Sequence, residues 1–223
     1  IEVTDRHDYK KVGDEALLLN KIGPTIVSKD RSLGAKLIEK HEDNFNVIIM
    51  DDGLQNYQLE QDIKFLLVDK NLKFGNEFCI PAGPLREPIN QGLIRIDAIV
   101  LTGNNNKDAD FNNVHNKTIF NSKVKTIKSP KIKNEKLLAF CGLANSNKFY
   151  ETLKENGFNV TSTKSFPDHY EYKNEDIEKL ILEANKQKLK LITTEKDYVK
   201  IKYDKNLINL SLIHISEPTR PLH

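Results

Sequence analysis

The sequence lacks several features that would decide its class at once. Its 223 residues contain only two cysteines, Cys79 and Cys141, which lie far apart and form neither a paired metal-binding motif nor a disulfide framework. This cysteine usage favours a reducing compartment. No apolar run approaches the roughly 18 residues of a membrane-spanning helix. A disulfide-stapled scaffold is therefore excluded, and no segment predicts a transmembrane helix.

The sequence also lacks an excess of either charge. It has 34 basic and 32 acidic residues, a net charge of +2, so bulk electrostatics gives no argument for binding nucleic acid. Hydrophobic residues make up 38% and charged residues 30%, which is typical of a globular protein. The length allows one large or two small domains, and we expect no nucleic-acid partner.

Two phosphate-binding motifs are missing as well. The sequence contains no G-x-x-x-x-G-K-[ST] loop, and no G-x-G-x-x-G follows a predicted strand. An enzyme that acts on a nucleotide needs a cradle for the phosphates. Either the chain is not such an enzyme, or the cradle lies outside these residues.

Short apolar runs alternate with helical patterns, which predicts an α/β fold with mostly parallel sheets. A helix after Asp30 is expected to bury Leu33, Leu37 and Ile38. A second helix is indicated by apolar residues spaced i, i+3, i+4, i+7 from Ile177. The runs without polar alternation predict strands buried on both faces: residues 47–50, 65–68, 98–101, 137–141 and 189–193.

The composition divides the chain. Around residues 104–134 it becomes rich in Asn, Lys and Asp, which predicts a linker with a short β-ribbon. We therefore expect an N-terminal α/β domain, a hinge and a second α/β domain. Residues 211–223 follow neither period and contain two prolines, so we interpret them as an irregular, non-native tail. The predicted boundaries are 1–116, 117–133, 134–210 and 211–223.

Adjacent acids follow the predicted strand at residues 47–50. Asp51 and Asp52 would project beyond its carboxyl end, where ligands bind in open α/β sheets. Two carboxylates there suit Mg²⁺, as a Walker-B acid does in phosphate-transferring proteins. A polar turn is the alternative interpretation of Asp-Asp-Gly. Asp14 and Glu15 precede an apolar stretch, and Asp14 could simply cap that helix.

Three further segments carry charged or ionisable groups. The proline-rich loop at residues 81–88 presents Arg86 and Glu87. It could bind an anion through Arg86, or it could be an ordinary surface loop. His169, next to an aspartate, could be a base, an orienting group, a metal ligand or a structural histidine. Lys196 could approach an anion, although helix capping by Thr194 accounts for its segment.

Taken together and in order, these segments resemble the tetraacyldisaccharide 4'-kinase family of lipid A biosynthesis in Gram-negative bacteria. Each block alone is weak, and the ordered set is specific. It covers nearly the whole chain apart from the tail. The matching blocks are VGDEALLL at 12–19, VIIMDDGLQ at 47–55, PAGPLREP at 81–88, AFCGLAN at 139–145, FPDH at 166–169 and TTEKD at 193–197.

The resemblance implies a P-loop-type kinase with two α/β/α domains joined by a β-ribbon hinge. Such a kinase transfers the γ-phosphoryl group of ATP to the 4'-hydroxyl of tetraacyldisaccharide 1-phosphate, uses Mg²⁺ and gives lipid IVA. The enzyme would lie peripherally on the cytoplasmic face of the inner membrane. The glycine-rich ATP loop and a membrane-associating helix of the family would precede Ile1, so we expect this chain to be an inactive fragment.

The resemblance also implies residue roles. Asp14 would accept the hydroxyl proton, and His169, on the other domain, would orient it once the domains close. Asp51 and Asp52 would hold the metal. Further polar positions would line the same cleft: Glu15, Gln55, Arg86 and Glu87. The family has a histidine after its Asp-Asp-Gly block, whereas this chain has Asn56, which cannot carry charge.

Two alternatives stay open at this point. The chain could be a non-catalytic module that binds a phosphorylated glycolipid or a partner through the Arg86 loop and the lysine-rich second half. It could also be another Mg²⁺-dependent α/β protein that handles phosphate.

Overall fold

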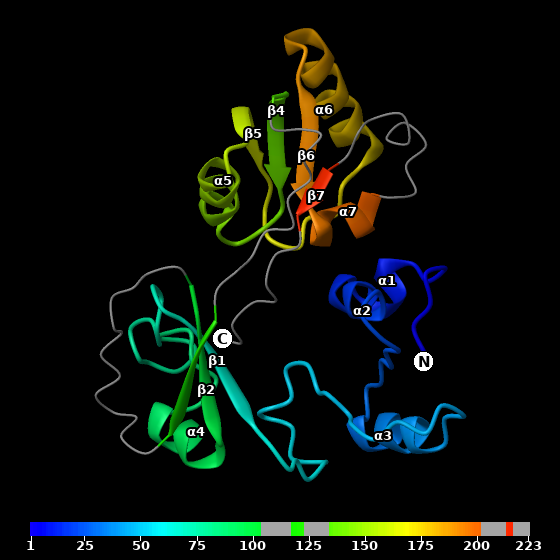
Figure 1. Cartoon of the computed structure of the whole chain (residues 1–223), viewed down its shortest axis with the longest axis vertical. Helices are drawn as coiled ribbons and strands as arrows, with labels where there is room; N and C mark the ends of the chain where they lie inside the picture. Colours follow the sequence, from blue (N-terminus) through cyan, green and yellow to red (C-terminus); the bar gives the residue numbers. More distant parts are fainter. Residues whose placement is uncertain (104–116, 123–133, 202–212, 216–223) are drawn as a thin grey trace. The chain divides into compact units, whose positions relative to one another are not determined.

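The structure is a computed structural model that describes residues 1–103, 117–122, 134–201 and 213–215. The chain separates into two compact units (Figure 1). The first unit combines Ile1–Val27 with Thr126–Glu217, and the second unit comprises Ser28–Lys125. Within the described helices, none has both the length and the apolar content that a bilayer crossing requires.

A parallel sheet forms the centre of the first unit. Its strand order is β5-β4-β6-β7, with every neighbouring pair parallel. The strands are β4 (Lys136–Cys141), β5 (Asn159–Ser165), β6 (Lys190–Thr194) and β7 (Ile213–Ile215). Because parallel neighbours need crossover connections, the chain returns through α5 (Ser146–Glu155) and α6 (Asn174–Gln187). The predicted α/β class is therefore confirmed for this unit.

Strand β4 is buried on both of its faces, as its continuous apolar run predicts. Leu137 and Ala139 pack with Phe149 and Leu153 of α5. The alternate residues Leu138 and Phe140 pack on the opposite face with α6 residues that follow the predicted helical spacing: Ile177, Leu180 and Ala184. The unit is thus three layers, with the sheet between α5 and α6 (Figure 1).

The N-terminal helices belong to this first unit because they pack against its last described helix. These elements are α1 (Tyr9–Val12), α2 (Asp14–Asn20) and α7 (Glu195–Ile201). Val12, Ala16 and Leu17 form one buried apolar cluster with Val199 of α7. This packing brings the start of the chain beside the end of β6.

The second unit contains a three-stranded parallel sheet in the order β1-β2-β3. Its strands are β1 (Phe65–Asp69), β2 (Ala98–Thr102) and β3 (Thr118–Ser122). Helix α4 (Ile89–Arg95) covers it through Leu93, which packs with Ile96, Val68 and Ile99. Helix α3 (Arg31–Glu39) begins after Asp30, whose side chain accepts hydrogen bonds from the N–H groups of Ser32 and Leu33 and so confirms the predicted cap.

Three sequence-based expectations about this unit are wrong. Residues 47–50 form no strand, and Val47 and Ile49 are 73% and 90% exposed. A strand buried on both faces needs partner strands in a sheet and packed elements over each face of that sheet, and no described strand pairs with 47–50. Leu33 and Leu37 of α3 are also exposed, since no described apolar cluster packs against them. The expected burial of 65–68 on both faces is wrong as well, because Phe65 at the start of β1 is 48% exposed. Residues 118–122 of the expected linker form β3, a parallel strand of the sheet.

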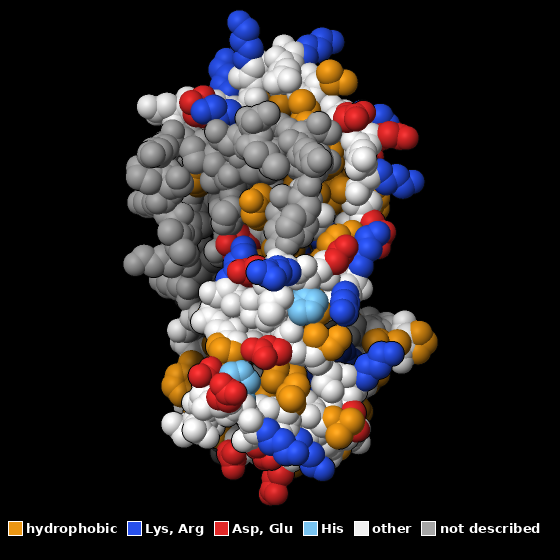
Figure 2. All heavy atoms as spheres, turned by 90° about the vertical axis from the view of Figure 1, so that its right-hand side faces the viewer, with side chains coloured by type: hydrophobic (Ala, Val, Ile, Leu, Met, Phe, Trp, Pro, Cys, Tyr) orange, Lys and Arg blue, Asp and Glu red, His pale blue; other side chains and the backbone are white. Residues whose placement is uncertain are grey.

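The predicted domain boundaries stay a prediction, although the compact units group the residues differently by joining 1–27 to the C-terminal half. The rest of the expected linker, 123–133, lies outside the described residues. In the expected tail, Ile213–Ile215 forms β7 beside β6, so that short stretch is regular. The tail's non-native origin stays a prediction. On the face shown in Figure 2, basic and acidic side chains are interspersed and form no single large patch of one sign.

Candidate active site

The carboxylate of Asp14 is buried at the start of α2. The preceding Gly13 has φ 92° and ψ 151°, a conformation that an L side chain rarely adopts, and it turns the chain sharply from α1 into α2. Asp14 is only 6% exposed, and its Oδ1 accepts a hydrogen bond of 3.1 Å from the backbone N–H of Glu15. A negative charge at this position is favoured by the helix dipole.

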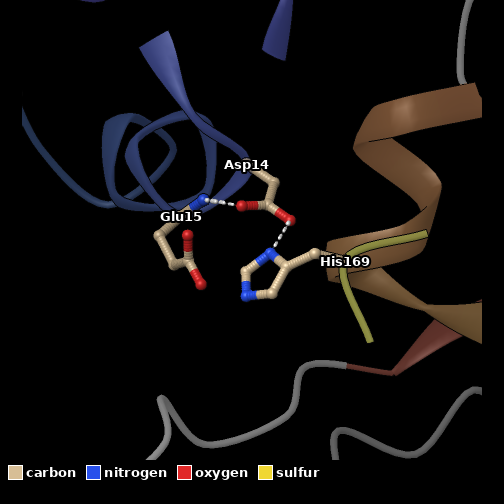
Figure 3. A group of neighbouring side chains, drawn as sticks. All are labelled: Asp14, Glu15 and His169. Carbon is tan, nitrogen blue, oxygen red and sulfur yellow. Dashed lines mark hydrogen bonds and ion pairs between the residues drawn. The ribbon is translucent and has the colours of Figure 1, made fainter. Parts of the chain in front are cut away.

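His169 lies on the short loop that follows β5. The N–H of Tyr170 donates to the carbonyl of Pro167, which closes a turn, and His169 has φ 55° within it. Histidine tolerates this left-handed conformation better than most residues do, and such positions cluster at functional sites. The turn directs the half-exposed imidazole at α2, with Nδ1 3.7 Å from Oδ2 of Asp14 (Figure 3). The sequence-predicted Asp14–His169 pair is thus in contact.

This contact lies inside the first unit. The resemblance implied that Asp14 and His169 occupy different domains and meet only when the domains close. Both residues instead belong to one compact unit, because α2 packs on α7. The pair therefore needs no movement between the two units to form.

Two lysines of α7 surround Asp14. Nζ of Lys200 lies 3.3 Å from Oδ2 of Asp14, and Nζ of Lys196 lies 3.9 Å from the same oxygen. Burial acts to raise the pKa of Asp14, but the hydrogen bond with Glu15 and the two ammonium groups outweigh it and hold that pKa below its usual value of 3.8. Asp14 is therefore a carboxylate at neutral pH.

Helix α7 is fixed in place by Asp197, which is fully buried. Its Oδ2 accepts hydrogen bonds from the backbone N–H of Gly142 at 3.0 Å and from the hydroxyl of Thr194 at 2.8 Å. The Thr194 hydroxyl in turn accepts from the N–H of Asp197, which is the capping interaction that the sequence predicts. These bonds tie the start of α7 to the carboxyl ends of β4 and β6.

Within the described residues, Asp14, Glu15 and His169 offer three possible metal-ligand atoms within 4.8 Å of one another. The positive charges of two neighbouring lysines oppose the binding of a metal cation to these three residues. Lys196 already lies 2.8 Å from Oε1 of Glu15, and Lys200 contacts Asp14. A divalent ion would have to displace these two ammonium groups, so the arrangement suits acid–base chemistry better than metal binding.

The second unit holds the other sequence-predicted residues in one network. Nη1 of Arg86 donates to both carboxylate oxygens of Asp52, at 2.6 and 2.9 Å. Gln55 accepts from Arg86 at 3.4 Å and donates to Glu87 at 2.8 Å. Glu87 also pairs with Arg95, whose other nitrogen donates to the carbonyl of Leu54. The network thereby links the turn that carries Asp52, the loop that carries Arg86 and helix α4.

Asp51 and Asp52 lie in the turn before this network. Asp51 is exposed, its carbonyl accepts a hydrogen bond from Arg31, and Asp52 has φ 50°. Adjacent carboxylates are hard oxygen ligands, and Mg²⁺ commonly uses one or two of them together with water and phosphate oxygens. Because Arg86 and Asp52 are both partly exposed, that ion pair can exchange. The two acids fit a magnesium ion by the kind of their donors, and binding through Asp52 requires that Arg86 move away from its carboxylate.

A cavity of about 310 Å³ lies beside the same network. Gln55, Arg86 and Glu87 contribute polar groups to its wall. Most of the remaining lining is apolar, including Leu66, Leu67, Leu72, Phe74, Leu85 and Ile89. A ligand with an apolar chain and a charged or polar group would match such a lining.

The predicted site residues therefore form two clusters, one in each unit. Asp14, Glu15 and His169 meet in the first, and Asp52, Gln55, Arg86 and Glu87 meet in the second. Sequence reasoning missed Lys200, Asp197 and Arg95. The i, i+4 spacing of Lys196 and Lys200 after a buried strand is a signal for the two lysines. No pattern in the sequence indicated Arg95.

In the first unit, charged side chains lie beyond the carboxyl ends of parallel strands, where α/β proteins bind their ligands. Together with the acid–arginine network of the second unit, they define an α/β protein with charged clusters of the kind that bind polar ligands. The chain belongs to the tetraacyldisaccharide-1-P 4'-kinase family, whose model matches residues 1–217. The family that the sequence motifs predicted is thus confirmed.

Known relatives agree with this assignment. The chain is 41% identical over 204 residues to a tetraacyldisaccharide 4'-kinase of Paramagnetospirillum magneticum, covering 90% of this chain and 62% of the relative. It is 42% identical over 202 residues to that of Rickettsia bellii, covering 89% and 61%. The LpxK crystal structure from Aquifex aeolicus, described as an "apo" form in complex with ATP, matches with a TM-score of 0.69 at 27% identity, covering 95% of this chain and 64% of that one. The chain thus spans about three fifths of the length of these relatives.

We predict that the ionised Asp14 stabilises the chain in a pH-dependent way. Because its pKa is lowered in the folded state, the contribution is complete above the unfolded value near 3.8 and is lost as the pH falls through the lower, folded value. At pH 7, Asp14→Asn should lower the free energy of unfolding by about 2 kcal/mol, since it removes the nearer of the two carboxylates beside the buried Lys200 and leaves only Asp197, at 3.7 Å. Urea unfolding from about pH 7 to pH 3 should show this difference shrinking in acid.

Glu135→Gln is the matched control for this experiment. Glu135 pairs with Lys190 at 2.7 Å in the same unit, but both side chains are partly exposed, so the loss should stay within about 0.5 kcal/mol. If Asp14→Asn lowers the free energy of unfolding equally at acidic and neutral pH, the conclusion that Asp14 is ionised in the folded chain would be contradicted.

Proposed function

We propose that the protein containing this chain transfers the γ-phosphoryl group of ATP to the 4'-hydroxyl of a tetraacyldisaccharide 1-phosphate and so forms lipid IVA. Family membership and the names of the relatives support this activity. ATP as phosphate donor is supported by the ligand named for the Aquifex aeolicus structure. The single observation that carries the proposal is the Asp14–His169 pair, buried on one side and open to solvent on the other.

Phosphoryl transfer depends mainly on positioning and charge neutralisation, with one proton to remove from the attacking hydroxyl. The Asp14–His169 pair is the proposed acceptor of that proton. Asp14 lies behind the imidazole, buried and charged, whereas His169 presents its ring to solvent. A carboxylate behind a histidine orients the ring and stabilises its protonated form, and an imidazole changes protonation near neutral pH. Both residues therefore contribute to one proton-accepting unit.

Asp51 and Asp52 are the proposed holders of Mg²⁺. When bound, the metal neutralises charge on the transferring phosphate. Arg86, which already contacts a carboxylate through one guanidinium nitrogen, has the donors to bind a phosphate oxygen in its place. Gln55 and Glu87 hold this arginine loop against the turn that carries the two acids.

We further propose that this chain alone turns over weakly or not at all. No segment of its 223 residues has either of the two common phosphate-cradling motifs, and its relatives are considerably longer. The acceptor carries several acyl chains, so we place the whole enzyme at the cytoplasmic surface of the bacterial inner membrane.

The kinase proposal predicts transfer of radiolabel from γ-labelled ATP to the acceptor lipid by the full product of the gene that encodes this chain. Asp14→Asn and His169→Gln should each lower kcat by about a hundredfold or more, because each removes part of the proton acceptor. Glu135→Gln, at the paired surface carboxylate, should leave kcat unchanged. The short chain alone should transfer little label.

Thin-layer separation of the labelled lipid provides the measurement. An unaltered full-length protein that labels no disaccharide would refute the kinase proposal. Activity of Asp14→Asn and His169→Gln at the unaltered rate would refute the pair while leaving the kinase in place.

The apolar cavity of the second unit supports a lipid acceptor. We propose that it receives part of an acyl chain, with Arg86 near an anionic group of the same ligand. This proposal also covers the alternative that the chain acts as a module that binds a phosphoglycolipid without catalysis. The cavity lies entirely within the second unit, so binding can be measured on this chain itself.

Leu72 offers a direct test of the cavity. It lines the wall and is 50% exposed, so Leu72→Glu places a charge there with little cost in stability. Binding of tetraacyldisaccharide 1-phosphate to the chain, followed by fluorescence or calorimetry, should weaken by about tenfold or more. Leu182→Glu, at an exposed leucine of the first unit, is the control that should bind normally. If both variants bind the lipid equally well, the lipid does not occupy this cavity and the proposal is refuted.

A further inference from the structure

Lys196 contacts the imidazole of His169, and the mechanism proposed above gives this contact no role. Its Nζ lies 3.5 Å from Nε2 of His169 and 2.8 Å from Oε1 of Glu15, and it is also 3.9 Å from Oδ2 of Asp14. Lys196 is nearly buried, at 9% exposed, so this position is set by packing and is not one of many conformations of a surface lysine. The imidazole therefore has a carboxylate near Nδ1 and an ammonium group near Nε2.

The position of Lys196 follows from the anchoring of α7. Asp197 ties the first turn of the helix to Gly142 and Thr194, and Val199 packs on α2. Residues three and four apart share one face of a helix, so Lys196, Val199 and Lys200 all face α2. The same packing that brings Lys200 to Asp14 brings Lys196 to His169.

These contacts have a consequence for the protons of the neutral ring. A neutral imidazole has one N–H donor and one acceptor nitrogen, and the neighbours of each nitrogen decide which is which. An ammonium group only donates, and a carboxylate only accepts. Electrostatics favours the form with the proton on Nδ1, the nitrogen nearer the Asp14 carboxylate, and the lone pair on Nε2, the nitrogen nearer the Lys196 ammonium group. The reverse form would place an N–H near the ammonium group and a lone pair near the carboxylate.

We propose that Lys196 is a positioning residue of the proposed active site, which selects the Nδ1–H form of His169 and so leaves Nε2 as the atom that accepts a proton. Glu15 supports this role because it holds the ammonium group from the other side. At 3.5 Å the contact between Lys196 and Nε2 is long, and a substrate hydroxyl can replace it while Lys196 stays paired with Glu15.

The direct test is the state of the His169 ring, measured by nitrogen NMR on this chain at about pH 8.5, where an ordinary imidazole is neutral. The signal is assigned among the six histidines by its loss in His169→Gln. The unaltered chain should show the Nδ1–H pattern. Lys196→Met should shift the ring markedly towards the Nε2–H form, whereas Lys196→Arg, which keeps a charged donor, should retain the original pattern.

Lys190→Met is the control, because it removes a lysine of the same unit that is paired at 2.7 Å with Glu135. It should leave the His169 pattern unchanged. Urea unfolding identifies any variant that fails to fold, and Lys196→Gln then takes the place of Lys196→Met. An Nε2–H pattern in the unaltered chain, or no change in a folded Lys196 variant without a charge, would overturn the proposal.

The kinetic part of the test rests on the proposed function. In the full-length protein, Lys196→Met should lower kcat by about tenfold or more with little change in KM for the lipid, since it alters the acceptor nitrogen and not the lipid site. Lys196→Arg should recover most of the activity. An inactive unaltered protein would count against the kinase alone, because the NMR result does not depend on turnover.

Discussion

The ion pair between Asp14 and Lys200 is the interaction on which the first unit's site depends. Their side chains are only 7% and 2% exposed, and a charge buried in this way is tolerated only beside an opposite charge. The pair forms because apolar residues of α2 pack on Val199, while Asp197 fixes α7 to the sheet. A buried charge, and with it an oriented histidine, thus follows from ordinary core packing.

The proposed chemistry divides between the two units. The first unit carries the proposed proton-accepting pair with its lysines, and the second carries the proposed magnesium ligands, the arginine loop and the apolar cavity. Each group of residues is assembled by contacts within its own unit. A substitution in one cluster is therefore expected to leave the geometry of the other intact, and effects on folding and on catalysis can be assigned to one unit at a time.

Local patterns in the sequence predicted much of this. Runs such as 137–141 are buried on both faces, the spacing from Ile177 forms α6, and Asp30 caps α3. Residues 47–50 have the same apolar character as β4 and are nevertheless exposed, because burial depends on neighbouring strands that a local pattern does not reveal. The pairing of position 14 with position 200 is likewise a matter of tertiary packing. Family motifs identified Asp14 and His169 but implied that they lie in different domains, whereas one compact unit holds both.

The coupling between Asp14 and Lys200 in the free energy of unfolding tests this account most directly. It is obtained at neutral pH from the unaltered chain, Asp14→Asn, Lys200→Met and the double variant. A buried ion pair predicts that the two changes are strongly non-additive, with a coupling of about 1 kcal/mol or more. Additive changes, with a coupling indistinguishable from zero, would show that the two side chains do not meet and would contradict the proposed organisation of the site.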